Sequence, residues 1–191
     1  MSLRRPPYNR VAPLIKDYLS TKEWEDTAPL IRQLRPARKR GHLTPSELVT
    51  ICRWKSPRAL QLIKSNSPFR VRNATRRALA TRSERRRLEI LIELNGVSVP
   101  MASAILTLLN PKRYGVIDIR VWQLLHAVGT VTKNPSGVRF SFKHWYQFLM
   151  IIRYFAKRFG VNARDIERTL FLAHKEYQKG KLYRASGEKR S

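Results

Sequence analysis

Residues 88–122 read LEILIELNGVSVPMASAILTLLNPKRYGVIDIRVW, and this stretch decides how the middle of the chain folds. Apolar residues recur at helical spacing up to Leu94 and again from Met101 onward. Between these two runs lies the sequence NGVS, whose glycine, Gly96, can adopt a positive φ or allow a close backbone approach. The pattern therefore predicts a helix, a tight turn and a second helix over about residues 84–109.

The start of the second helix has the residues of a phosphate site. Ser98 is expected to cap this helix, and Pro100 is tolerated in its first turn. The free amide groups at a helix start can bind a phosphate without any charged side chain. Gly96 and Ser98 are therefore candidate DNA-phosphate contacts, although a plain helical hairpin in a bundle would have the same residues.

A carboxylate follows the second helix at a position where chemistry is possible. Asp118 comes directly after Val116 and Ile117 and stands at the start of another apolar-patterned segment, as an N-cap does. A helix N-terminus favours the ionised carboxylate. Capping alone would explain this aspartate, but an ionised acid beside a groove could also stabilise a developing sugar cation.

Start and stop signals for helices recur along the rest of the chain. Thr44 begins a capping box with proline at the next position, Ser141 precedes a long apolar stripe that Gly160 ends, and Asn162 can cap a last helix. No alternating strand pattern is present. We expect one all-α domain over residues 1–191, with residues 1–10 and 178–191 flexible at its ends.

The composition narrows the class of protein. The 191 residues are 42% hydrophobic and 27% charged, which is typical of a globular chain, and no apolar run is long enough to span a membrane. A single cysteine, Cys52, excludes an intramolecular disulfide and an iron–sulfur cluster held by four cysteines. We expect a cytoplasmic protein, associated with the nucleoid through DNA.

Positive charge points to a nucleic-acid partner. Lys and Arg number 39 against 13 acidic residues, a net charge of +26. Such a polycation favours a polyanion through counterion release, and self-repulsion favours a monomer in its absence. Arginines crowd residues 70–87, with Glu84 as the one acid among them. The candidate phosphate contacts in this cluster are Arg76, Arg77, Arg85 and Arg86.

The middle segment resembles the helix-hairpin-helix (HhH-GPD) DNA glycosylases. The motif of that family is a Leu-Pro-Gly-Val-Gly hairpin followed by a catalytic aspartate; this chain has Leu94-Asn95-Gly96-Val97-Ser98, and Asp118 follows Gly96 by 22 positions. The resemblance implies an all-α fold with two helical lobes around a DNA-binding cleft, Asp118 as the catalytic residue, and a possible monovalent cation at the hairpin. Asn95 and Ser98 replace the proline and second glycine of the motif.

The resemblance also implies the type of reaction. Bifunctional members of the family have a Schiff-base lysine four residues after the first hairpin glycine, where this chain has Pro100. It therefore looks like a monofunctional glycosylase, which flips out and hydrolytically excises a damaged or modified base and leaves an abasic site. Lys55, Lys112 and Lys133 leave open a lysine at another position.

Two biological roles are open to such an enzyme, because the sequence does not identify the base that it excises. One is base-excision repair. The other is antiviral defence against phages with glucosylated hydroxymethylcytosine, with which some short relatives are associated. Two non-enzymatic alternatives are a helix-hairpin-helix protein that only binds DNA or RNA, and a ribosome-associated basic protein.

The base pocket is the least defined part of the predicted site. The stretch Arg53–Arg58 joins an aromatic ring to cations at a break between helices, and other polar or aromatic residues stand near helix starts. The candidate pocket residues are Trp54, Lys55, Asn66, Tyr114 and Trp122. The four histidines have no metal-ligand spacing and are expected at the surface or hydrogen-bonded in the core, so no metal site and no cofactor is predicted, and no obligate protein partner is evident.

Overall fold

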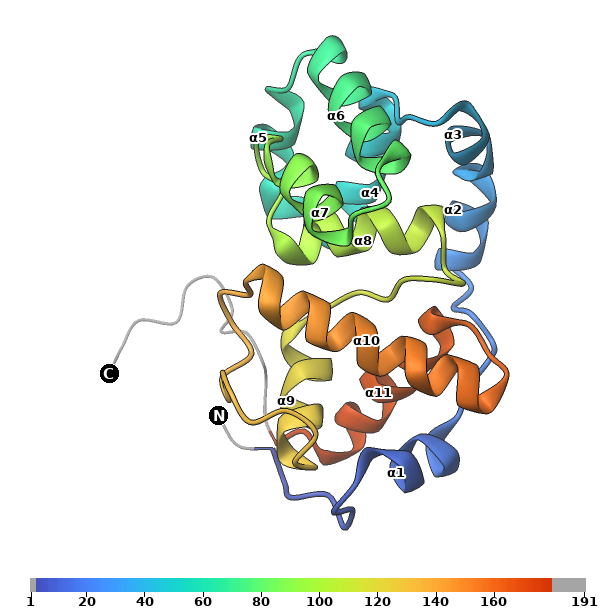
Figure 1. Ribbon diagram of the computed structural model, residues 1–191, viewed down its shortest axis with the longest axis vertical. Helices are drawn as coiled ribbons and strands as arrows, with labels where there is room; N and C mark the ends of the chain where they lie inside the picture. The colour runs from blue at the N-terminus through green and yellow to red at the C-terminus, as the bar shows by residue number, and fades with distance from the viewer. Residues whose placement is uncertain (1–2, 180–191) are drawn as a thin grey trace.

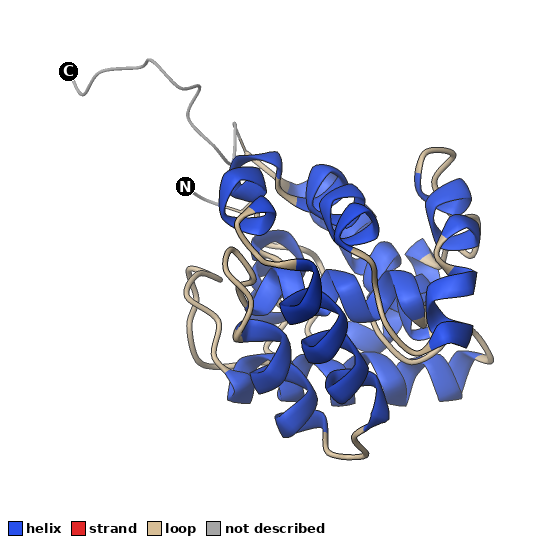
Figure 2. Ribbon diagram, turned by 90° about the horizontal axis from the view of Figure 1, so that it is seen from above, coloured by secondary structure: helices blue, strands red, loops and turns tan. Residues whose placement is uncertain are grey.

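The computed structural model describes residues 3–179 and confirms the all-α prediction. Helices and loops make up this part of the chain, apart from one isolated antiparallel bridge between Leu3 and Gln178 (Figure 2). The α-helices are α1 (Val11–Tyr18), α2 (Thr27–Gln33), α3 (Arg35–Arg40), α4 (Pro45–Lys55), α5 (Leu60–Lys64), α6 (Pro68–Ala80), α7 (Glu84–Ile92), α8 (Val99–Leu109), α9 (Ile119–Ala127), α10 (Phe142–Phe159) and α11 (Ala163–Tyr177).

Local capping chemistry sets the predicted helix starts. The Thr44 hydroxyl accepts a hydrogen bond from the Glu47 amide at 3.2 Å, and the Glu47 carboxylate accepts one from the Thr44 amide at 2.7 Å. Ser141 forms the corresponding box with His144 at the start of α10, and Gly160 ends this helix at a φ of +68°. These caps act within one helical turn, which is why the sequence predicted them.

The helices form two groups in space. Figure 1 shows α2 to α8 in one group and α1, α9, α10 and α11 in the other. Helix α8 is buried along its whole length and contacts α2, α3, α4, α7 and α10. After α8 the chain crosses to the second group through residues 110–118 and enters α9 (Figure 1). The start of α9 and the turn between α7 and α8 therefore both lie where the two groups meet.

One acidic residue joins the two groups. Glu84, at the start of α7, accepts hydrogen bonds from Arg153 of α10 at 2.8 Å, from Arg87 at 2.7 Å and from Arg113 at 3.1 Å. Burial raises the pKa of this carboxyl, but the hydrogen bonds from Arg153 and Arg87 lower it more, so its pKa lies below the ordinary value. The one acid in the arginine cluster therefore pairs with a single arginine of that cluster, Arg87, and with two arginines outside it, Arg113 and Arg153.

Two short helical segments lie among the longer helices of the group α2 to α8. Residues 35–40 form α3, because Ala37 anchors the helix in the core and Gly41 ends it at a φ of +77°. Ser56-Pro57 starts a short 3₁₀ helix (Pro57–Ala59) that leads into α5.

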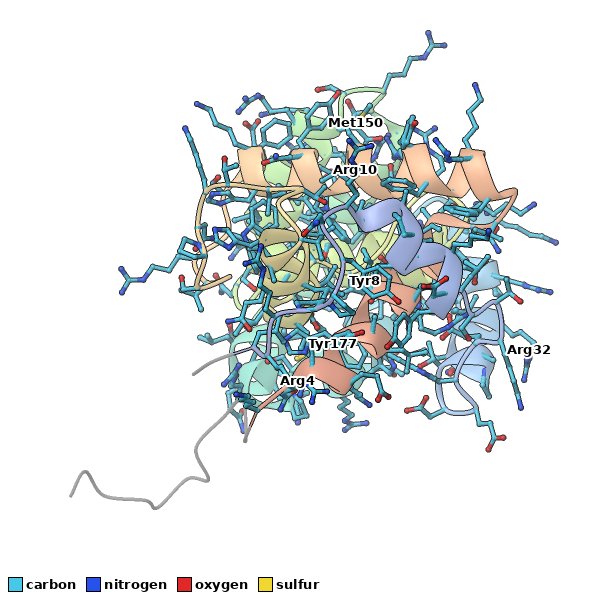
Figure 3. The ribbon with its side chains drawn as sticks, turned by 90° about the horizontal axis from the view of Figure 1, so that it is seen from below. Arg4, Tyr8, Arg10, Arg32, Met150 and Tyr177 are labelled. Carbon is cyan, nitrogen blue, oxygen red and sulfur yellow. The ribbon has the colours of Figure 1, made fainter. Side chains whose placement is uncertain are left out.

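The amino-terminal segment lies against the end of α11. The Arg4 amide donates to the carbonyl of Tyr177 at 2.8 Å, and the Arg4 guanidinium lies 5.9 Å from the centre of the Tyr177 ring. Figure 3 shows these two side chains at the same end of the molecule. Of the two ends expected to be flexible, residues 3–10 and 178–179 belong to the described part, and residues 180–191 lie outside it.

Candidate active site

The turn between α7 and α8 is held close to α5, and this is why it needs a glycine. Gly96 has a φ of +78°. A Cβ at this position would lie 2.9 Å from the Leu62 Cβ and 3.1 Å from the backbone nitrogen of Ile63. Both the backbone conformation and the absence of a side chain are therefore required for this turn to approach α5.

Asn66 fastens the same turn and does not belong to a pocket. Its side-chain oxygen accepts from the Asn95 amide at 2.9 Å, and its nitrogen donates to the Asn95 carbonyl at 3.0 Å and to the Ile63 carbonyl at 2.9 Å. Its side chain is buried and lines neither of the cavities described below. An amide beside a turn satisfies backbone groups well, and that use explains the residue here.

The start of α8 leaves its amide groups without a side-chain cap. Ser98 is the N-cap residue in extended conformation, but its hydroxyl makes no capping hydrogen bond. The prediction that Ser98 caps this helix through its side chain is therefore wrong. The side chain is exposed. Pro100 has no amide hydrogen and the Ala102 amide donates to the Ser98 carbonyl, so the amides without a capping side chain are those of Val99 and Met101.

Asp118 is the N-cap of α9, as predicted. Its Oδ1 accepts a hydrogen bond from the Val121 amide at 2.9 Å, and the residue is partly buried. The cap fixes the carboxylate at the end of the segment that connects the two groups of helices.

A cavity of about 730 Å³ joins this carboxylate to the turn. We call it the Gly96 cavity. Asp118 and Ile119 line it together with the whole turn, so the structure brings Asp118, Gly96 and Ser98 together. Its lining residues are Lys55, Ser56, Arg58, Ala59, Leu62, Ile92, Glu93, Leu94, Asn95, Gly96, Val97, Ser98, Pro100, Met101, Asp118, Ile119 and Phe140.

Asp118 also lines a second cavity, of about 320 Å³. We call it the tryptophan cavity, because the rings of Trp24 and Trp54 line it. Asp118 and Lys55 line both cavities, and so they stand where the two adjoin. The lining residues are Trp24, Asp26, Trp54, Lys55, Val116, Asp118, Arg120, Arg164, Glu167 and Phe171.

Two of the predicted base-pocket residues therefore line a cavity and three do not. Trp54 and Lys55 do; Asn66, Tyr114 and Trp122 do not. The Tyr114 hydroxyl donates to Glu84 at 3.0 Å and its ring stacks on Trp145, while Trp122 is fully buried and donates to the Asn134 carbonyl at 2.9 Å. Both rings belong to the core, because a large aromatic side chain contributes more to the stability of the fold when it is buried than when it is exposed.

The predicted phosphate arginines lie outside both cavities. Arg76 and Arg86 are exposed, Arg77 pairs with Glu93 at 3.1 Å, and Arg85 covers a ring of α10, that of Phe142, at 4.1 Å. The arginine that lines the Gly96 cavity is Arg58, from the basic–aromatic stretch 53–58.

Two residues that line the tryptophan cavity, Arg164 and Glu167, belong to a buried charge network. The Arg164 guanidinium, 2% exposed, donates to both oxygens of Glu23 at 3.0 and 3.2 Å and to Glu167. It also lies 4.9 Å from the Trp24 ring centre and 5.7 Å from that of Trp54. Burial raises the pKa of Glu23, but Arg164, the Trp24 amide and Arg168 together lower it below the ordinary value, so this carboxylate is held ionised.

Sequence reasoning missed Arg164, Glu167 and Trp24 as site residues. Arg164 and Glu167 are three positions apart in α11, a spacing that is typical of an exposed helical ion pair. Trp24 lies among the acidic residues Glu23, Glu25 and Asp26, a composition that is typical of an exposed segment. No local pattern reveals that these segments meet, because they are about 140 residues apart in the chain.

One histidine also differs from expectation. His174 is 1% exposed, and neither of its ring nitrogens has a hydrogen-bond partner among residues 3–179. Burial, with a contribution from Arg120, lowers its pKa from 6.5 to about 4. His174 is therefore a neutral core residue, where a hydrogen-bonded or surface histidine was expected.

Neither a metal centre nor a membrane segment is found in the described part of the chain. Across residues 3–179, no group of three or more His, Cys, Asp or Glu side chains is arranged to hold a metal ion. No helix in this range has the length and apolar character needed to cross a bilayer.

Comparison of the chain with protein-family models, with curated proteins and with solved structures gave no match in any of the three. The two adjoining cavities and the carboxylate between them are therefore the features from which a function can be inferred.

Proposed function

We propose that this protein is a monofunctional DNA glycosylase, which swings a damaged or modified base out of the helix and hydrolyses its bond to deoxyribose. The observation that carries the proposal is the position of Asp118, which lines the Gly96 cavity and the tryptophan cavity at once. In this proposal the two groups of helices act as two lobes of a DNA-binding cleft, α7 and α8 form the helix-hairpin-helix motif, and the protein acts as a monomer.

The Gly96 cavity is suited to a strand backbone. The uncapped amides at the start of α8 can donate to a phosphate oxygen, and Arg58 and Lys55 add positive charge on the same cavity. The exposed Arg76 and Arg86 would add contacts along the duplex and make binding strongly dependent on salt.

The tryptophan cavity is suited to the extruded base. A base inside a duplex cannot be reached, so extrusion costs a few kcal/mol that contacts with the strand and stacking must offset. The rings of Trp24 and Trp54 offer flat surfaces for stacking. With the phosphate in one cavity and the base in the other, the deoxyribose lies beside Asp118, the residue common to both.

In this proposal the negative charge of the Asp118 carboxylate assists hydrolysis of the glycosidic bond. The glycosidic C–N bond breaks through a transition state that resembles an oxocarbenium ion. The Asp118 carboxylate stabilises this positive charge electrostatically and can accept a proton from the attacking water.

The monofunctional assignment depends on the absence of an attacking amine. Pro100 lines the Gly96 cavity and has no amine, whereas Lys55 lines both cavities. Borohydride added during turnover should trap no covalent protein–DNA adduct. An adduct that Lys55→Gln abolishes would instead assign a strand-cutting, bifunctional mechanism.

The test of the proposal is base release by the native protein and by Asp118→Asn. Asparagine caps a helix as well as aspartate does, so this variant should fold and bind DNA normally. Substrates should include duplexes with alkylated purines, oxidised guanine or deaminated pyrimidines, and phage DNA with glucosylated hydroxymethylcytosine. Free base is measured by mass spectrometry and abasic sites by alkali cleavage.

The results of this experiment distinguish a glycosylase from a protein that only binds DNA. Release that Asp118→Asn abolishes while binding persists supports the glycosylase, and the substrate that reacts distinguishes a repair role from antiviral defence. Equal release by both proteins removes Asp118 from the mechanism. DNA binding without release from any substrate favours the alternative of a non-catalytic binding protein, for which the hydrogen bond from Val121 to Asp118 is only a helix cap.

A further inference from the structure

We propose that Glu167 is a second catalytic residue, the acid that protonates the departing base. The inference rests on the proposed glycosylase function and deepens it. Hydrolysis of a C–N bond leaves a pair of electrons on a base nitrogen, and an acid placed beside the base can neutralise that charge as it develops.

Glu167 lies where a base in the tryptophan cavity would meet it. Its side chain lines this cavity together with Asp118 and is only 2% exposed. It reaches this position because Gly115 has no side chain: a Cβ on Gly115 would lie 2.6 Å from the Glu167 Cβ. The segment before Asp118 therefore packs directly on α11 at Glu167.

The charges around Glu167 leave it short of positive partners. Arg164 donates to it, but the same guanidinium binds both oxygens of Glu23. Arg168 also pairs with Glu23, but it pairs with Asp165 as well, so two guanidinium groups are shared among three carboxylates. The other charged groups that face the cavity are Lys55, Arg120, Asp26 and Asp118.

The balance of these effects favours the protonated form. Burial raises the pKa of Glu167 and the negative charge of Asp118 raises it further, while Arg164 and Lys55 lower it. The net shift is upward. A neutral carboxyl still accepts the hydrogen bond from Arg164 on one oxygen and has an O–H donor on the other.

Two carboxyl groups in one site can then have opposite roles. Asp118 is a helix cap and Glu167 is a buried acid, so one group can face the sugar cation while the other faces the leaving group. As the C1′–N bond breaks, its electron pair goes to the base and the Glu167 proton follows it. Water adds to C1′ and gives a proton to Asp118, and exchange with solvent restores both groups.

The test compares Glu167→Gln with a matched control, Glu23→Gln. Both variants remove a carboxylate from the same guanidinium of Arg164, but Glu23 does not line the tryptophan cavity. Single-turnover rates are measured on an oligonucleotide duplex that holds the base released by the native protein. A second duplex holds the same base with an electron-withdrawing halogen, which makes it a better leaving group.

We expect Glu167→Gln to slow release by about 10²- to 10³-fold and Glu23→Gln to have much less effect. The native rate should fall as pH rises through the Glu167 pKa, and this limb should be absent in Glu167→Gln. The halogenated base should restore most of the lost rate in Glu167→Gln but not in Asp118→Asn, because only the former lacks an acid for the leaving group.

Four results would overturn the assignment. If Glu167→Gln and Glu23→Gln slow release equally, Glu167 serves only to hold Arg164, and thermal unfolding of both variants will show the matching loss of stability. An unchanged pH limb in Glu167→Gln, or no rescue by the better leaving group, also refutes the acid role while Asp118 remains catalytic. If the native protein releases no base from any substrate, the proposed function fails and this inference fails with it.

Discussion

Replacing Gly96 with alanine tests whether the turn between α7 and α8 is built by close contact with α5. Gly96 has a φ of +78°, where an alanine costs about 1–2 kcal/mol. The new Cβ would lie 2.9 Å from the Leu62 Cβ and 3.1 Å from the Ile63 backbone nitrogen, neither of which can rotate away. Overpacking of this kind costs about 1–3 kcal/mol.

The expected net effect is a destabilisation of about 2–4 kcal/mol, since alanine also reduces the entropy of the unfolded chain by about 0.4–1 kcal/mol. Gly160→Ala is the matched control. Its φ is +68°, and nothing lies within 4 Å of its Cβ position, so only the backbone term applies and the cost should be about 1 kcal/mol.

Urea unfolding of both variants measures the free energies of unfolding. Gly96→Ala should lose more stability than Gly160→Ala by about 1–3 kcal/mol, the overpacking contribution. It should also weaken DNA binding, because the turn must shift. Equal losses in the two variants would show that contact with α5 does not constrain the turn. That contact would then not determine the shape of the Gly96 cavity either.

Three further substitutions have defined outcomes. Asp118→Ala should lower the free energy of unfolding by about 1 kcal/mol while Asp118→Asn changes it by a few tenths, measured by thermal unfolding; equal losses would deny the cap. Glu84→Gln should destabilise the fold by about 3 kcal/mol at pH 7, because Arg87 and Arg153 lose their carboxylate, and a change below 1 kcal/mol would contradict this. Folding lowers the pKa of His174 from 6.5 to about 4, so as the pH falls the unfolded chain takes up a proton at this residue before the folded chain does. The free energy of unfolding therefore has its full value above pH 6.5 and falls by about 3 kcal/mol as the pH approaches 4. His174→Phe should flatten this part of the pH profile in urea titrations; an unchanged slope would refute the assignment.

The parts of the site that sequence predicted are those governed by neighbours within one or two helical turns. Gly96 and Asp118 could be singled out because a tight turn and a helix cap require particular residues at particular positions. For the aromatic candidates, the local sequence did not predict which rings line a cavity. Trp54 lines a cavity while Trp122 is fully buried, and both are tryptophans near helix ends. Residue type and local pattern do not distinguish a ring that lines a cavity from one that fills the core.

The sequence by itself determined the helical class, the positions of the main caps and the basic character of the chain, because capping, turn geometry and net charge depend on residues close together or on composition alone. Only the tertiary structure decided that Trp24, Arg164 and Glu167 adjoin Asp118. These residues come from opposite ends of the chain, and their meeting depends on how α9 and α11 pack, with Gly115 allowing the close approach. Packing of this kind is a property of the whole core, and no local stretch of sequence contains it.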